Sequence, residues 1–261
     1  MSLNNEEIKS RALGVKMNKI KSSSLFYKFQ RSLSVRVSIF LSDFVLFIKP
    51  NHISVLAVVL VILTLVLSLG SNYYNPYVII IIQLILLFIS SILDKVDGEL
   101  ARIQNNFSQK GIYLDILYHL YYVLVFYLVT GFFFFYIFEH EFYLIFSILL
   151  AVLMVSYKLT GKIRHHIRFK IILEDHKNDI IDFGRINFKK QPRPVRWFNY
   201  LIFMTYDWVW LFYLFLIFIT YTNIYIAEVL YGIYILLAIT FVSVELFYKY
   251  PKQGLFKKEE I

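Results

Sequence analysis

The residues with the clearest chemical potential lie between Asp94 and His119, flanked by long apolar runs. Asp94 and Asp97 are three residues apart, so their carboxylates share a face if this segment is helical. Asp115 and His119 are four residues apart and share a face under the same condition. Two helical faces joined by a polar turn bring three carboxylates and an imidazole to one point. Because carboxylate oxygens suit hard divalent cations, the pattern predicts a site for Mg²⁺ or Mn²⁺.

The same stretch carries residues that suit a phosphate ligand. Arg102 supplies a fixed guanidinium fork, which binds phosphate oxygens in pairs. Gly98 and Gly111 have no Cβ, so the backbone or a ligand can approach closely at both points. A cation site, an arginine and two glycines together indicate a site for a diphosphate.

The spacing of these residues carries a family resemblance. Written out, the pattern is Asp94-x2-Asp97-Gly98-x2-Ala101-Arg102-x8-Gly111-x3-Asp115-x3-His119. It resembles the signature of the CDP-alcohol phosphatidyltransferase family at every fixed position except the last, where the family has aspartate. The resemblance implies a membrane enzyme with six spanning helices. Such an enzyme moves a substituted phosphate from a CDP-linked donor to an alcohol and releases CMP.

The resemblance also implies roles for individual residues. Asp94, Asp97 and Asp115 would ligate one or two Mg²⁺ (or Mn²⁺) ions that bridge the pyrophosphate of the donor. The residues implied to contact CDP are Asp94, Asp97, Gly98, Ala101, Arg102, Ser108 and Gly111. The donor is expected to be CDP-diacylglycerol or another CDP-alcohol, and the pathway phospholipid or related polyol-phosphate lipid biosynthesis. A homodimer is implied by the resemblance alone.

His119 is the point at which the chain departs from the family. In the family this position activates the acceptor hydroxyl and ligates metal, and imidazole has an ordinary pKa near neutrality, as a base requires. Three interpretations stay open: His119 is the general base, His119 is only a metal ligand, or the chain has lost catalysis and binds a cytidine nucleotide or lipid. Since imidazole brings no negative charge, a second Mg²⁺ would be held less tightly.

Composition predicts an integral membrane protein. Of the 261 residues 59% are hydrophobic and 19% aromatic, and the mean hydropathy is +0.62. Several apolar runs reach the roughly 20 residues that cross a bilayer. The chain has no cysteine, so thiol chemistry is excluded. The net charge of +9 is typical of cytoplasmic loops beside anionic lipid headgroups rather than of nucleic-acid binding.

The expected fold is all-α, with six transmembrane helices preceded by an N-terminal amphipathic interfacial helix. A polar, basic arm over 1–24 precedes one membrane domain over 25–261, in which the interfacial helix covers about 25–48. The expected spans lie between 53 and 248, at about 53–69, 77–93, 111–138, 142–157, 200–220 and 225–248. Basic residues gather on the side of the termini, so the site is expected to face the cytoplasm of a prokaryotic inner membrane.

The acceptor pocket is less clearly marked in the sequence. Lys158, Lys162 and Arg164 begin a basic loop over 158–198 and would suit a phosphorylated acceptor. Contact of this loop with anionic membrane lipids explains the same charges equally well. A small transporter is disfavoured, because the carboxylates lie at the surface ends of the expected spans rather than at the midplane.

Overall fold

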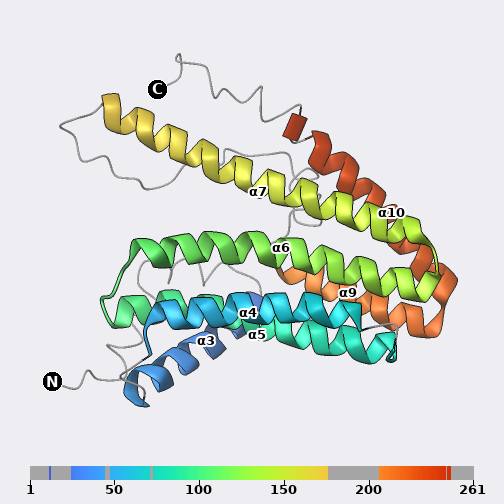
Figure 1. Cartoon of the computed structure of the whole chain (residues 1–261), viewed down its shortest axis with the longest axis horizontal. Coiled ribbons are helices and arrows are strands. Elements are labelled where there is room, and N and C mark those ends of the chain that lie inside the picture. Colours follow the sequence, from blue (N-terminus) through green and yellow to red (C-terminus); the bar gives the residue numbers. More distant parts are fainter. Residues whose placement is uncertain are drawn as a thin grey trace. The chain divides into compact units, whose positions relative to one another are not determined.

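The computed structural model describes residues 12, 25–44, 48–70, 73–175, 206–244 and 246–247, with residues 43–44, 161–175 and 206–211 as backbone only. Within these ranges the chain forms seven helices and no β-strand. The helices are α3 (Leu25–Phe44), α4 (Pro50–Leu69), α5 (Pro76–Ile103), α6 (Gln109–Phe138), α7 (Glu141–Asp175), α9 (Tyr206–Thr222) and α10 (Ile224–Val244) (Figure 1). The predicted all-α class is confirmed for the described part of the chain.

Five of the described helices are long and apolar enough to cross a bilayer. They are α4, α5, α6, α10 and the first part of α7, Glu141–Thr160. This pattern indicates an integral membrane protein. The described apolar part of α9 is shorter, Phe212–Thr222, so a sixth span stays a prediction. α3 forms a helix where an amphipathic one was predicted, and its place in the membrane interface also stays a prediction.

The chain divides into two compact units, Met1–Ala151 and Val152–Ile261. In the second unit α9 packs against α10. The ring of Tyr213 on α9 lies 6.0 Å from that of Tyr234 and 6.5 Å from that of Tyr231 on α10. The prediction of a single membrane domain over 25–261 stays a prediction.

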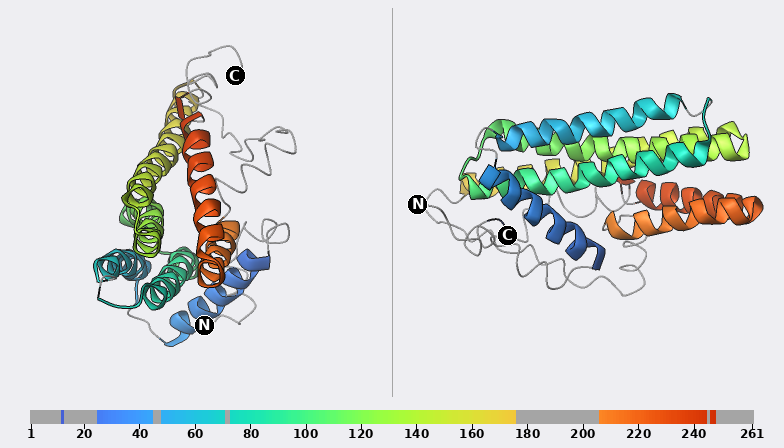
Figure 2. Two further views of the ribbon diagram at one scale, coloured as in Figure 1. Left: turned by 90° about the vertical axis from the view of Figure 1, so that its right-hand side faces the viewer. Right: turned by 90° about the horizontal axis from the view of Figure 1, so that it is seen from below.

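The first unit holds every residue of the predicted metal and nucleotide site. In it α4, α5 and α6 run side by side, and α3 crosses α5 obliquely (Figure 2). Proline favours the first helical turn, where its missing N–H is not needed, and Pro50 and Pro76 open α4 and α5. Asn75 caps α5 and Ser108 caps α6 through their side-chain oxygens. Proline and cap residues therefore fix where the helices of the site begin.

The helix of the fourth expected span, α7, is longer than the sequence predicted. The apolar run ends near Tyr157, and a loop was expected from Lys158, but α7 continues to Asp175. Residues 158–175 contain no proline, and their lysines, arginines, isoleucines and leucines tolerate helix well. The prediction was wrong because the end of an apolar run is not the end of a helix. Residues 176–198 of the predicted loop, the arm over 1–24 apart from Ala12, and residues 245 and 248–261 lie outside the described residues.

The close approach of α6 and α7 gives a stability prediction. A Cβ built on Gly131 would overlap Ser147 Cβ and lie 2.7 Å from Ser147 Oγ. Gly131→Ala should therefore lower the free energy of unfolding by about 1–3 kcal/mol, the usual cost of overpacking, although alanine favours helix over glycine. Thermal and denaturant unfolding in detergent measure this loss. Gly70→Ala is the control, because among the described residues its added Cβ would meet only Leu67 O, at 3.5 Å. Equal stability of the two variants would contradict the close packing of Gly131 against Ser147.

Candidate metal and nucleotide site

The centre of the site is a group of three side chains from two helices. Asp94 comes from α5, and Asp115 and His119 come from α6. His119 Nε2 lies 3.6 Å from Asp115 Oδ1 and 3.9 Å from Asp94 Oδ1. One ligand atom from each residue lies within 4.8 Å of the others. The side chains are 52%, 29% and 15% exposed for Asp115, His119 and Asp94, so a ligand can reach the group from solvent.

The chemistry of this group fits a divalent cation. Carboxylate oxygens are the ligands that Mg²⁺ and Mn²⁺ prefer, and imidazole nitrogen ligates many divalent metals. Without a cation, two carboxylates held this close would repel each other. A cation placed among the three ligand atoms removes that repulsion. These residues therefore suit a metal ion of the predicted kind.

Asp97, the fourth predicted ligand, is anchored by the neighbouring helix. Ser54 Oγ on α4 donates a hydrogen bond of 2.5 Å to Asp97 Oδ2, and Asp97 is only 9% exposed. The side chains of Asp94, Asp115 and His119 form a group that could hold a metal ion without it. Ser54 is not among the site residues that the sequence predicted. Ligation by Asp97 stays a prediction.

The guanidinium of Arg102 has an N–H donor that no described residue accepts from. Its Nε donates to Ala12 O at 2.8 Å, and its Nη1 lies 3.6 Å from the point that a Cβ on Gly98 would occupy. Its Nη2 is buried and has no hydrogen-bond partner among the described residues. A buried N–H group without an acceptor is costly, more so when it carries charge. An anionic ligand beside Gly98 would satisfy this guanidinium.

The turn between α5 and α6 is held by short polar contacts. Asn105 has a φ of 51°, in the left-handed region that asparagine tolerates better than most residues. Ser108 Oγ accepts from Gly111 N at 2.9 Å and donates to Asn51 Oδ1 at 3.2 Å. A Cβ on Gly111 would lie 3.1 Å from Asn51 Oδ1. Ser108 and Gly111 thus fix the start of α6, and their predicted contact with CDP is untested.

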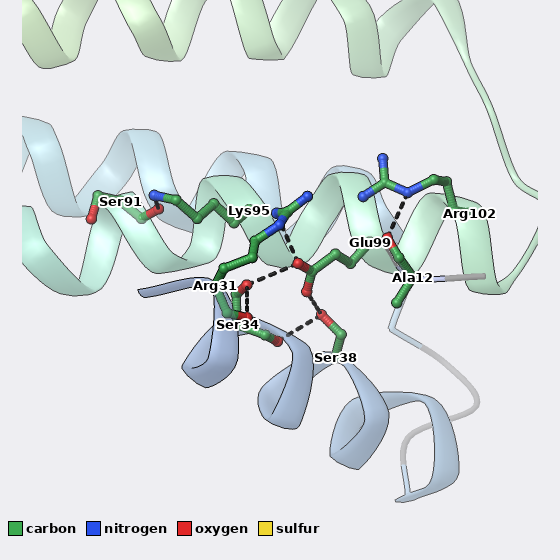
Figure 3. Close-up of polar contacts among 8 residues, drawn as sticks. All are labelled: Ala12, Arg31, Ser34, Ser38, Ser91, Lys95, Glu99 and Arg102. Carbon is green, nitrogen blue, oxygen red and sulfur yellow. Dashed lines mark hydrogen bonds and ion pairs between the residues drawn. The ribbon is translucent and has the colours of Figure 1, made fainter. Parts of the chain in front are cut away.

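Sequence reasoning missed a buried polar cluster beside the site, which we call the Glu99 cluster (Figure 3). It consists of Glu99 on α5 with Arg31, Ser34 and Ser38 on α3. All four residues are at most 3% exposed. The three α3 residues follow a spacing of three and four, which places them on one helix face. That spacing of one arginine and two serines was the signal available in the sequence.

Comparison with known families bears on the resemblance seen in the sequence. Residues 47–173 match the family model described as CDP-alcohol phosphatidyltransferase. The predicted resemblance to this family is confirmed over these residues. No curated protein matches the chain. The matched region contains the whole pattern from Asp94 to His119, and histidine as a variant of the last position is not confirmed by the match.

The family has a known general chemistry. CDP-alcohol phosphatidyltransferases transfer a substituted phosphate group from a CDP-alcohol to an alcohol acceptor in a membrane, and they are generally metal-dependent. The group of Asp94, Asp115 and His119 agrees with that metal dependence. The predicted acceptor residues are less well defined: Lys158 lies on α7 in the second unit, and the side chains of Lys162 and Arg164 lie outside the described residues. Their role stays a prediction.

Proposed function

We propose that the chain is a metal-dependent transferase that moves a substituted phosphate from a CDP-linked donor to an alcohol and releases CMP. The donor is CDP-diacylglycerol or another CDP-alcohol, and the product belongs to phospholipid or related polyol-phosphate lipid synthesis. The observation that carries the proposal is the convergence of Asp94, Asp115 and His119 from α5 and α6 inside the region that matches the family.

Asp94, Asp97, Asp115 and His119 hold one or two Mg²⁺ or Mn²⁺ ions in this proposal. The bound metal would supply positive charge that stabilises the phosphoryl oxygens of the donor. The hydrogen bond from Ser54 orients the carboxylate of Asp97, as supporting residues around metal ligands commonly do. With an imidazole in place of a fourth carboxylate, one ion is held more tightly than a second.

Arg102 binds the donor phosphates, because its Nη2 is buried and has no other acceptor among the described residues. Gly98 gives the diphosphate room to approach, since its missing Cβ would stand beside Arg102 Nη1. Ala101, Ser108 and Gly111 complete the nucleotide pocket.

His119 is proposed to receive the proton of the acceptor hydroxyl while that oxygen attacks phosphorus and CMP departs. Lys158, Lys162 and Arg164 are proposed to bind the acceptor. The enzyme is proposed to be a homodimer of one membrane domain over 25–261, with its site facing the cytoplasm of a prokaryotic inner membrane. The arm over 1–24 carries basic residues that favour anionic lipid.

The test is release of CMP by the purified full chain in detergent with Mg²⁺, using a panel of CDP-alcohol donors and alcohol acceptors. We expect one donor and acceptor pair to give CMP and the coupled product, and EDTA to stop the reaction. Binding of CDP without turnover on any pair would support the alternative, an inactive family member, which the departure at His119 leaves open. If the chain neither turns over any pair nor binds a cytidine nucleotide, both the enzyme and the inactive binding protein are refuted.

A further inference from the structure

Glu99 is a buried carboxylate whose hydrogen-bond acceptor positions are almost all filled by side chains of α3. Its side chain is fully buried. Arg31 Nη1 lies 2.8 Å from Glu99 Oε1, and Ser34 Oγ donates to the same oxygen at 2.8 Å. Ser38 Oγ donates to Glu99 Oε2 at 2.7 Å. One cation and two hydroxyls from a single face of α3 therefore engage both carboxylate oxygens (Figure 3).

Arg102 lies within reach of the same carboxylate but does not pair with it. It follows Glu99 by three residues on α5, the spacing at which opposite charges on a helix form ion pairs. Glu99, Asp97 and Arg31 are all near enough to act on the charge of Arg102. Among the described residues, however, the hydrogen bond of Arg102 goes to Ala12 O, and its Nη2 has no partner. The guanidinium lies beside Gly98 instead.

We propose that Arg31 is a positioning residue that keeps Arg102 available for the phosphates of a nucleoside diphosphate by occupying Glu99. A carboxylate has about four acceptor positions, and α3 fills three of them from one side. Without Arg31, the buried negative charge of Glu99 has no cation of its own. Lys95, the other cation of α5, donates to Ser91 O at 3.0 Å. Arg102 is then the cation left to pair with Glu99, and this ion pair turns its guanidinium away from Gly98.

This inference rests on the proposed function in one respect, the binding of donor phosphate by Arg102. It differs from a purely structural role for the Glu99 cluster, in which α3 is merely fastened to α5. In the structural case, Arg31 contributes only to stability, since removing one partner of a buried ion pair destabilises a protein more than removing both; the folded Arg31→Gln chain then keeps its CDP affinity. If Arg31 acts through Arg102, removing the charge of Glu99 as well should return Arg102 to the nucleotide.

The experiment measures CDP affinity of the purified full chain in detergent by calorimetry, with Mg²⁺ present. Arg102→Ala should weaken CDP binding roughly tenfold to hundredfold, the usual effect of losing a charged hydrogen-bond partner. Arg31→Gln should weaken it by a comparable factor, since Glu99 then captures Arg102. The double variant Arg31→Gln/Glu99→Gln should bind CDP within about threefold of the unsubstituted chain, a difference well below that of one charged contact.

Gln30→Ala is the matched control. Gln30 is 2% exposed, and its Nε2 donates to Ser91 Oγ on α5 at 3.1 Å, so its loss removes another contact between α3 and α5 but leaves Glu99 alone. We expect unchanged CDP affinity, with thermal unfolding recorded for every variant. If Arg31→Gln fails to fold, the double variant, which has no uncompensated charge, carries the test through its CDP affinity.

The results that would contradict the role of Arg31 differ from the result that would contradict the proposed role of Arg102. Unchanged binding by Arg31→Gln, or weak binding by the double variant, would overturn the positioning role of Arg31. Equal losses for Gln30→Ala and Arg31→Gln would also overturn it, in favour of simple fastening. If Arg102→Ala binds CDP normally, the assignment of Arg102 in the proposed function is wrong, whatever Arg31 does.

Discussion

Asp94→Ala should abolish divalent-cation binding and CMP release together. Asp94 is the contribution of α5 to the three-residue metal group, and without it Asp115 and His119 remain as a pair from one helix. Even with Asp97 as a further proposed ligand, two carboxylates and one imidazole hold Mg²⁺ poorly, because hard cations need several oxygen ligands. Loss of a residue that only hydrogen-bonds to a metal ligand already lowers metal affinity by about 10–100-fold. Loss of a ligand itself should therefore lower the affinity by about a hundredfold or more. Calorimetry with Mn²⁺ measures the affinity.

A matched control removes a carboxylate elsewhere in the same unit. Glu141 is exposed at the start of α7 and is not part of the metal group. Glu141→Ala should leave both metal affinity and CMP release unchanged, which separates a specific ligand from a general effect of negative charge. Metal binding by Asp94→Ala at the original affinity would place the ion elsewhere and remove the basis of the proposed site.

The metal group was predictable because its geometry is local. Asp115 and His119 share a face of α6 by spacing alone, and a short turn returns this face to Asp94 on α5. The partner of Asp97, by contrast, depends on the packing of a neighbouring helix. Three residues along a helix amount to a rotation of about 300°, which leaves Asp97 roughly 60° from Asp94. That difference turns Asp97 towards α4, where Ser54 donates a hydrogen bond to it.

The Glu99 cluster could not be predicted, because it depends on how α3 packs against α5. Arg31 and Arg36 both interrupt the apolar pattern of α3, yet Arg31 is 3% exposed and paired with Glu99, whereas Arg36 is exposed. Glu99 lies 65 residues from Ser34, its hydrogen-bond donor. No local periodicity distinguishes a cation that enters a buried ion pair from one that faces solvent.

The apolar pattern of α3 was informative only in part. Leu33, Val37 and Leu41 pack against the core of the first unit. Phe29 and Phe40 belong to the same run of apolar residues but are 59% and 57% exposed. The sequence could establish that α3 is a helix with apolar residues on it, but not which of them face the protein, because polar side chains occupy part of the buried face.

His119→Ala should lower turnover by about 10²–10⁴, the usual contribution of a general base, while CDP affinity stays within a few-fold because Arg102 and the aspartates remain. His119 Nε2 is the atom that faces Asp94 and Asp115, at 3.9 Å and 3.6 Å. We therefore expect the Mg²⁺ dependence of turnover to move to higher concentrations as well. His119→Asp should bind the metal more tightly than histidine does, since it restores a fourth carboxylate, and should remain active.

The metal dependence separates the two roles of His119. If His119→Ala loses turnover but keeps its original Mg²⁺ dependence, His119 is the base and not a ligand. If excess Mg²⁺ restores the turnover of His119→Ala, the imidazole is a ligand and the base lies elsewhere. His140→Ala is the control, because His140 is an exposed imidazole beyond the far end of α6 and is outside the metal group. An alanine at position 119 that behaves like this control would exclude His119 from both roles, since neither proton transfer nor metal binding would then depend on the imidazole.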